Sequence, residues 1–297
     1  MHEISRRQIL TASAAAALAA GAGVALGRAE PSATAPRAGL SGPALEVAES
    51  VDSGMRIARY GTQRVVWSVP VTEPVAAITF DDGPDPEFTP RILDALSAAG
   101  VTATFNVLGY NGVRHPSLLK EIVAAGHEIA NHTWSHLDLA YLAEPAVRAE
   151  IVRCKDEIGA VTGIPFASFR PPRGELGGAG FRICAELGYD VYIWSVARGP
   201  GNEQSPARVA EYVAESLQPG DVLGLHDGIG HSALAPHTAT AAALRARREV
   251  EVRALPELLR RTADKGIQLT SAGALSAKGT ASLVATAAVT APPVAKK

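Results

Sequence analysis

The sequence predicts an α/β protein built on a parallel sheet, and two features of the chain support this. Across residues 75–269, short β-prone runs alternate with amphipathic helical segments, the pattern of strands joined by helical crossovers. The polar residues suited to chemistry come directly after the expected strands, at the edge where parallel α/β folds carry their active sites. About seven strands fit either a closed barrel or an open doubly wound sheet, and periodicity alone does not choose between them.

The expected elements follow one another along this region. Strands are expected at residues 75–80, 102–107, 128–130, 166–169, 191–196, 221–225 and 267–270. Helices are expected at residues 89–99, 115–125, 144–161, 179–187, 207–217 and 255–265. Glycines follow four of these helices and are expected to end them, because glycine readily adopts the left-handed conformation common after a helix: Gly100, Gly126, Gly188 and Gly266.

The N-terminus has the features of an export signal. No acidic residue occurs between Glu3 and Glu30, and Arg6-Arg7 precede a stretch rich in Ala, Gly, Ser and Thr. A membrane anchor is the alternative, but these residues are weakly apolar and poor at holding a bilayer-spanning helix. Residues 1–29 are therefore interpreted as a twin-arginine-like signal peptide, with a secreted or cell-wall-associated protein and no stable membrane insertion after cleavage.

The rest of the chain is expected to carry a single catalytic domain. Residues 30–54 form a Pro/Ala/Ser-rich linker, and residues 55–74 contain two β-prone runs split by Gly61, which indicates a lead-in hairpin. The catalytic domain spans residues 75–272, and residues 273–297 are expected to form a disordered tail.

Composition excludes one class of partner and leaves other questions open. With 47% hydrophobic residues the chain can bury a core, and a net charge of −2 gives no basic surface suited to nucleic acid. Cys154 and Cys184 allow at most one disulfide, and two buried thiols are an equally good interpretation. The oligomeric state is not predicted.

Two adjacent carboxylates, Asp81 and Asp82, stand where the first strand ends in a Gly-Pro turn. Neighbouring residues at a strand end point in different directions, so one carboxylate can bind a metal while the other faces a substrate. Taken alone, the pair also fits a turn that caps a helix.

His132 and His136 are four residues apart, which would place both imidazoles on one face of a helical turn and suit one divalent ion. Zinc proteases with this spacing need a glutamate directly after the first histidine, and Thr133 stands there, which argues against that class. Asp82 would complete a site of two histidines and one carboxylate.

Two further residues follow predicted strands. Arg170 begins a rigid Pro-Pro turn and would clamp a carboxylate through its planar fork, or else lie solvated on a surface loop. Histidine side chains ordinarily titrate near neutral pH, so His226 would serve as a general acid, or else be an ordinary loop histidine.

Taken together and in this order, the segments TFDDGP (79–84), HTWSH (132–136), FRPPRG (169–174) and LHDG (225–228) resemble the polysaccharide deacetylases of carbohydrate esterase family 4. That family contains chitooligosaccharide, peptidoglycan and acetylxylan deacetylases. The resemblance covers residues 75–269 and implies a distorted (β/α) barrel of seven strands in place of the open sheet.

The resemblance also implies a reaction and a role for each motif. The chain would remove acetyl groups from an acetylated glycan, using a divalent metal that is zinc, with cobalt or nickel as alternatives. The implied roles are Asp81 as base, Arg170 as the residue that orients it, His226 as acid, Arg173 as main-chain oxyanion donor and wall of the sugar cleft, and Asp82, His132 and His136 as metal ligands.

The chain departs from the family pattern at three places. Arg173 stands where the family has an aromatic residue, which suggests an anionic substrate or a side chain in solvent. Ala197 and the residues after it replace the carboxylate that tunes the acid and a tryptophan of the acetyl pocket, so His226 would lack its partner or borrow Asp227 or another residue. Gly224 replaces an apolar residue, which would widen the pocket.

Two alternatives follow from these departures. A chain that has lost its acid partner would be a metal-containing glycan-binding protein of low activity. A reshaped cleft would instead suit a small, non-sugar amide.

Overall fold

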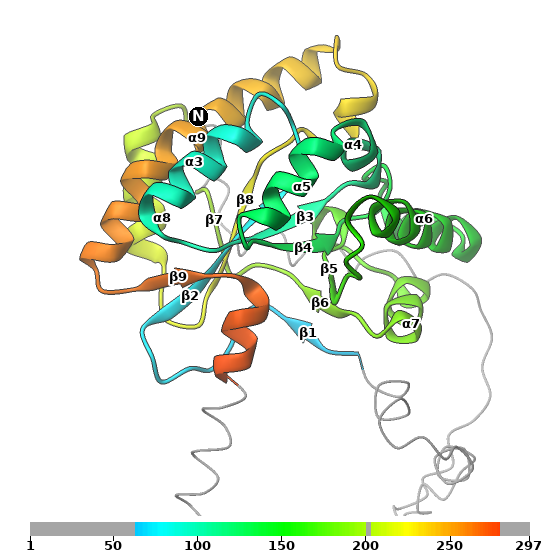
Figure 1. Cartoon of the computed structure of the whole chain (residues 1–297), viewed down its shortest axis with the longest axis horizontal. Coiled ribbons are helices and arrows are strands. Elements are labelled where there is room, and N and C mark those ends of the chain that lie inside the picture. The colour runs from blue at the N-terminus through cyan, green and yellow to red at the C-terminus, as the bar shows by residue number, and fades with distance from the viewer. Residues whose placement is uncertain (1–62, 200–202, 280–297) are drawn as a thin grey trace, which may run out of the picture. The chain divides into compact units, whose positions relative to one another are not determined.

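Parallel strands form the sheet at the centre of the structure (Figure 1). A computed structural model describes residues 63–199 and 203–279, and nine strands pair in one sheet within these ranges. They are β1 (Val65–Val66), β2 (Val75–Asp81), β3 (Thr104–Val107), β4 (Glu128–Asn131), β5 (Ser168–Phe169), β6 (Asp190–Tyr192), β7 (Val196–Ala197), β8 (Val222–His226) and β9 (Gln268–Thr270).

The sheet curls so that a single stretch, residues 190–197, supplies strands near both ends of the strand order. The strand order is β1-β6-β5-β4-β3-β2-β8-β7, with β9 paired to the first half of β2. β6 pairs with β5 (Phe169 opposite Val191), and only a few residues later β7 pairs with β8 (Val196 opposite Leu223). The expected strand at 191–196 is therefore broken in two, and the predicted distorted α/β barrel is confirmed as a curled, incomplete one.

Seven α-helices connect the described strands. They are α3 (Thr89–Ala99), α4 (Gly109–Arg114), α5 (Pro116–Ala124), α6 (Glu144–Thr162), α7 (Gly178–Leu187), α8 (Pro206–Ser216) and α9 (Ala239–Asp264). Short 3-10 helices lie in three loops: η1 (Leu139–Tyr141), η2 (Pro172–Gly174) and η3 (Gly230–Leu234). Figure 1 shows α3, α8 and α9 to the left of the strands and α4 to α7 above and to the right, and α3 contacts both α9 and α5, so the helices lie around the outside of the curled sheet.

Strands and helix ends follow from local sequence. Every residue of β2 is buried, and its first four residues, 75–78, form the continuous apolar run typical of a parallel strand covered on both faces. Helix α3 has proline in its first turn and ends at Gly100, whose φ of 66° is left-handed. Helix α6 ends in the same way at Gly163, with a φ of 70°.

Helix α9 is longer than the sequence indicated. Only 255–265 was expected, whereas the helix begins at Ala239, where the Thr238 hydroxyl accepts a hydrogen bond from the Ala241 N–H. Its first half buries Arg248 and Glu251, so its inward face lacks the apolar stripe by which an amphipathic helix is recognised. Pro256 lies inside the helix, with buried apolar residues such as Leu255 and Leu258 on both sides of it.

The C-terminal boundary also differs from the expected one at 272. Residues 272–279 are helical, and Leu275 is fully buried in a small apolar cluster with Val75 and Val222. The domain therefore extends to at least residue 279, because this segment covers apolar side chains of the sheet. The signal peptide, the linker, residues 55–62 of the expected hairpin and residues 280–297 lie outside the described residues. The other half of that hairpin contains β1, which pairs in parallel with β6.

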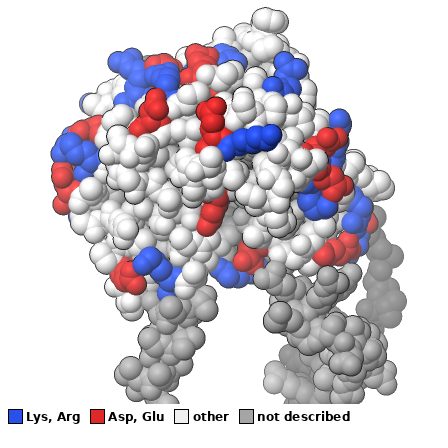
Figure 2. All heavy atoms as spheres, in the orientation of Figure 1, with Lys and Arg blue, Asp and Glu red and all other residues white. Residues whose placement is uncertain are grey.

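Three further findings concern the described ranges. None of their helices is long and apolar enough to cross a bilayer. Cys154 and Cys184 are both buried and unpaired, which answers the question of a disulfide within the described chain. The face in Figure 2 carries acidic and basic side chains interspersed, without a broad area of one sign.

Candidate active site

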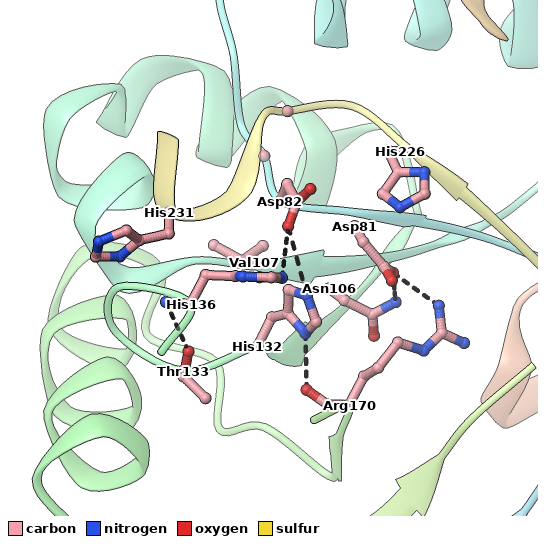
Figure 3. A network of polar contacts seen from close by, with 12 residues as sticks. Asp81, Asp82, Asn106, Val107, His132, Thr133, His136, Arg170, His226 and His231 are labelled. Carbon is pink, nitrogen blue, oxygen red and sulfur yellow. Dashed lines mark hydrogen bonds and ion pairs between the residues drawn. The ribbon is translucent and has the colours of Figure 1, made fainter. Parts of the chain in front are cut away.

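The residues singled out by sequence converge at the carboxyl ends of the strands. Asp81 ends β2 and Asp82 follows it, His132 follows β4, Arg170 follows β5, and His226 ends β8. Figure 3 shows Asp82, His132 and His136 grouped on one side of the site, with Asp81, Arg170 and His226 beside them. The expected juxtaposition of four separate motifs is therefore present in the structure.

Asp82, His132 and His136 form a group with the geometry of a metal site. One ligand atom from each lies within 4.8 Å of the other two. The Nε2 atoms of His132 and His136 are 3.6 and 3.3 Å from Asp82 Oδ1. That oxygen is buried and accepts no hydrogen bond, which is costly unless a cation binds it. Two imidazoles and a carboxylate with such an orphaned oxygen fit a divalent ion.

Outer contacts hold these ligands in place. His132 Nδ1 lies 2.7 Å from the Arg170 carbonyl oxygen. A carbonyl only accepts, so the ring donates from Nδ1 and turns the lone pair of Nε2 toward Asp82. Burial acts to raise the pKa of Asp82, but His136, His132 and Arg248 hold this pKa well below its usual range. The carboxylate is thus in the charged form that a cation binds.

The histidines do not lie on a helical turn as their spacing suggested. Residues 132–136 form a loop in which Thr133 and His136 have left-handed φ values of 73° and 60°. The Asn131 side-chain oxygen accepts from the Thr133 N–H at 2.9 Å, and the Thr133 hydroxyl accepts from the His136 N–H at 3.0 Å. Local side-chain bonds of this kind compete with a helix, so the loop brings the rings together instead.

A buried glutamate on α6 fixes the same loop. Ser135 donates from both its N–H and its hydroxyl to Glu150, each over 2.8 Å. Sequence reasoning missed this contact, because Glu150 reads as one more charged residue in a helix. Such support for a ligand-bearing loop is a common determinant of metal affinity.

Asp81 is held by two donors. Its Oδ1 accepts from Asn106 Nδ2 at 2.6 Å and from Arg170 Nη1 at 2.7 Å. Burial acts to raise the pKa of Asp81, but the Arg170 guanidinium together with His132 and His226 lowers this pKa below its ordinary value. Asp81 is therefore ionised and oriented, as a general base must be.

Arg170 is a buried clamp, as the first of its two interpretations expected. Its side chain is fully inaccessible. Besides Asp81 it binds the carbonyl oxygens of Tyr192, from Nε at 3.1 Å, and Ile193, from Nη2 at 2.9 Å. Both lie where the chain passes from β6 toward β7, so Arg170 links the orientation of the Asp81 carboxylate to this part of the sheet.

His226 has a carboxylate partner after all, and it comes from α9. Glu251 Oε2 lies 3.1 Å from the ring Nδ1 of His226 and accepts the backbone N–H of the same residue at 3.0 Å. Asp227 does not serve, since its carboxylate accepts from the Gly83 N–H and the Thr89 hydroxyl. The only signal in the sequence was an acidic residue three positions after an arginine in a charged helix.

The other two departures have structural outcomes. The Arg173 side chain is 69% exposed, with Nη1 3.8 Å from Asp138 Oδ2, so it points to solvent, and the alternative of an anionic substrate stays a prediction. Gly224 does not widen a pocket, because a Cβ there would lie only 3.2 Å from Trp194 Cβ and Cγ. The indole occupies the space that the missing side chain would have taken.

Comparison with known proteins agrees with these observations. The family model described as polysaccharide deacetylase matches residues 68–192. A peptidoglycan-N-acetylglucosamine deacetylase of Bacillus cereus is 37% identical over 169 residues, which are 56% of this chain and 79% of that protein. A chitooligosaccharide deacetylase of Sinorhizobium fredii is 33% identical over 201 residues, which are 67% of this chain and 90% of that protein.

A solved structure is also similar. The crystal structure of a peptidoglycan N-acetylglucosamine deacetylase with a bound N-oxidanyl-benzamide has a TM-score of 0.63 at 29% identity, covering 74% of this chain and 96% of that one. The fold, the three motifs within the matched region and the length of the matches agree. This chain belongs to the polysaccharide deacetylase family, carbohydrate esterase family 4.

Proposed function

We propose that this protein is a metal-dependent hydrolase that removes acetyl groups from an acetylated polysaccharide of the peptidoglycan, chitin or xylan type. The observation that carries the proposal is an ionised carboxylate, Asp81, fixed by Arg170 beside the cation-binding group of Asp82, His132 and His136. Both Bacillus cereus and Sinorhizobium fredii relatives bear names that specify amino-sugar deacetylation. The N-acetyl group of a glucosamine residue is accordingly the first substrate to test.

Asp82, His132 and His136 would hold the divalent ion, with zinc as the first candidate and cobalt and nickel as alternatives. A divalent ion there supplies Lewis acidity toward the acetyl carbonyl. The orphaned Asp82 Oδ1 and the turned Nε2 of His132 are the features of this chain that favour it.

Asp81 would act as the general base. Both of its protein donors bind Oδ1, so Oδ2 is the oxygen available to take a proton from the attacking water. Arg170 keeps the carboxylate charged and prevents its rotation. The main-chain N–H of Arg173 would donate to the developing oxyanion, a role that does not depend on its side chain.

His226 would act as the general acid. Its ring lies on the Asp81 side of the site, whereas His231 lies at the other side, beyond His136 (Figure 3). A proton given to the departing amine nitrogen or sugar oxygen completes hydrolysis and leaves acetate as the other product.

The export signal expected in residues 1–29 remains a prediction and would bring the protein to glycans outside the cytoplasm. Cell-wall peptidoglycan would then be within reach, as would chitin-type or xylan polymers from the surroundings.

Acetate release tests the proposal. Metal-loaded protein is incubated with N-acetylated chitooligosaccharide, peptidoglycan and acetylxylan, and the Asp81→Asn variant serves as the comparison. Release is expected from at least one glycan and should fall about 10²- to 10⁴-fold in the variant, while bound metal stays at the wild-type level. Folded, metal-loaded protein that is inert on every glycan contradicts the proposal, and glycan binding without turnover or activity on free amides alone identifies an alternative.

A further inference from the structure

Helix α9 joins the acid side of the site to the metal side through two residues one turn apart, Arg248 and Glu251. We propose that Glu251 is the positioning residue of the general acid His226 and that Arg248 couples it to the metal ligand Asp82. This inference rests on the proposed function. It concerns residues on a helix that none of the four motifs includes.

Glu251 contacts His226 at two atoms. One oxygen, Oε2, meets both the backbone N–H and the ring Nδ1, at 3.0 and 3.1 Å. The two contacts fix the end of β8 and the rotation of the imidazole together. With Nδ1 directed at the carboxylate, Nε2 is the nitrogen left to carry a proton to the leaving group.

The carboxylate of Glu251 is buried, so its charge needs partners. It is only 3% exposed. Its other oxygen, Oε1, lies 3.2 Å from Arg248 Nη1 and 3.3 Å from Arg198 Nε. Burial acts to raise the pKa of Glu251, but His226, Arg248 and Arg198 lower it. The Oε2 contact at Nδ1 in turn holds the ring in one orientation, with Nε2 free to face the leaving group.

Arg248 uses all three nitrogens of its guanidinium within the site. Nη1 binds Glu251, Nη2 binds Asp82 Oδ2 at 3.2 Å, and Nε binds the Gly228 carbonyl oxygen at 2.5 Å. The contact on Oδ2 leaves Oδ1 of Asp82 facing the two histidines. One buried side chain therefore orients a metal ligand and also holds the partner of the acid.

Ala197 stands at the position where the family resemblance places the carboxylate partner of the acid, and in this chain Glu251 of α9 supplies a carboxylate instead. Ala197 pairs opposite Gly224, and side chains two residues apart on a strand share a face, so position 197 faces the same side as His226. The methyl group of Ala197 offers the imidazole no charge. The carboxylate of Glu251 reaches the same ring from the helix instead, and Arg198, which follows Ala197, now pairs with it.

Other charges also act on His226. The carboxylates of Asp81 and Asp82 are close enough for His226 to lower the pKa of each. Arg248 and Arg198 oppose them on the far side of Glu251. Loss of the Glu251 charge should therefore weaken acid catalysis by His226 without abolishing it.

The first test separates acid catalysis from folding. Glu251→Gln is compared with Glu249→Gln, an exposed glutamate on the same helix that pairs with Arg91. With N-acetylated chitooligosaccharide, kcat should fall about 10- to 100-fold in Glu251→Gln, KM should change little, and the alkaline limb of the pH profile should move to lower pH. With 4-nitrophenyl acetate, whose phenolate leaves without a proton, the loss should stay within about threefold.

A rescue experiment and a conservative variant give a second test, which remains informative if Glu251→Gln folds poorly. Adding Ala197→Asp to Glu251→Gln should restore part of the lost kcat on the amide, because the new carboxylate faces the side of His226. Glu251→Asp keeps the charge and should show a smaller loss with the same difference between amide and ester. Equal losses on both substrates, an unmoved alkaline limb and absence of rescue would each overturn the role of Glu251.

The role of Arg248 is tested without turnover. Zn²⁺ affinity, measured by competition with a chelating dye, should fall about 10-fold or more in Arg248→Gln and remain unchanged in Arg253→Gln, an exposed arginine on the same helix. Unchanged affinity in Arg248→Gln overturns the coupling to Asp82. If the wild type binds Zn²⁺ with this dependence on Arg248 but releases no acetate from any glycan, the proposed function fails and the coupling stands.

Discussion

Arg170 donates from Nη1 to Asp81 Oδ1 over 2.7 Å, and both groups are almost entirely withdrawn from solvent. The same guanidinium binds the carbonyl oxygens of Tyr192, the last residue of β6, and of Ile193, which follows it. One side chain therefore links the charge and orientation of Asp81, the proposed base, to the stretch of chain that joins β6 to β7.

Replacing Arg170 by glutamine should both destabilise the protein and alter its pH profile. The unpaired buried carboxylate should cost about 3–5 kcal/mol of unfolding free energy. Without the guanidinium the pKa of Asp81 rises, so the acidic limb of kcat/KM should move to higher pH. Denaturant unfolding and a pH–rate profile measure these effects. Arg173→Gln is the control, and it should leave the acidic limb in place; an unmoved limb in Arg170→Gln contradicts the assignment of Asp81 as base.

The contact between Ser135 and Glu150 should determine how well the histidine loop holds a metal. Glu150→Gln replaces a charged acceptor of two hydrogen bonds by an amide, and Zn²⁺ affinity should fall about 10-fold or more. Glu157→Gln, on an exposed part of the same helix, is the matched control. A competition titration that gives the same affinity for both variants rules out this role for Glu150.

Gly228 allows a close approach that no other residue can make. A Cβ at this position would lie 2.3 Å from the Asp82 carbonyl oxygen and 2.8 Å from the Gly83 nitrogen. Gly228→Ala should cost about 1–3 kcal/mol of unfolding free energy and weaken metal binding, because the backbone of Asp82 must move. Gly159→Ala in α6 meets nothing within 4 Å and should stabilise by about 0.5–1 kcal/mol. Opposite signs in thermal unfolding are the expected outcome; a neutral Gly228→Ala contradicts the close contact.

Asp227 should make the metal-free protein less stable as pH rises. Burial raises the pKa of Asp227 from 3.8 to about 8. Between these values the folded state holds a proton that the unfolded state has released, so stability falls with pH, with a slope of up to about 1.4 kcal/mol per unit. The contribution is complete below pH 4 and lost above pH 8. Asp227→Asn, neutral at every pH, should flatten this dependence in EDTA-treated protein; identical urea midpoints against pH in both proteins contradict it.

The fold was predictable because its signals are local and repeated. Buried strands such as β2 contain continuous apolar runs, and glycines such as Gly100 mark where helices end. The site was predictable in outline because strand ends meet at one edge of a parallel sheet. His132 and His136 do converge, although a loop brings them together and not a helical turn.

What sequence could not give was long-range pairing of charges. Glu251 and Arg248 contact residues of β8 and the turn after β2, and nothing in their immediate neighbourhood distinguishes them from exposed helix charges. The helix that carries them was missed over its first half for the same reason, since it buries ion pairs where an apolar stripe was sought. Gly224 shows a similar limit. A glycine fits this position because the Trp194 side chain, from the segment between β6 and β7, occupies the adjacent space, and this contact is not visible in the local sequence.

The most direct test of the central claim is a titration of EDTA-treated protein with Zn²⁺ during hydrolysis of N-acetylated chitooligosaccharide. Acetate release should rise in proportion to added metal and level off at one ion per chain, while a variant with His132→Ala and His136→Ala binds no ion with comparable affinity and releases none. Release that is unaffected by removal of metal, or a full equivalent of tightly bound Zn²⁺ in the double variant, would contradict a metal-dependent deacetylase with its ion at Asp82, His132 and His136.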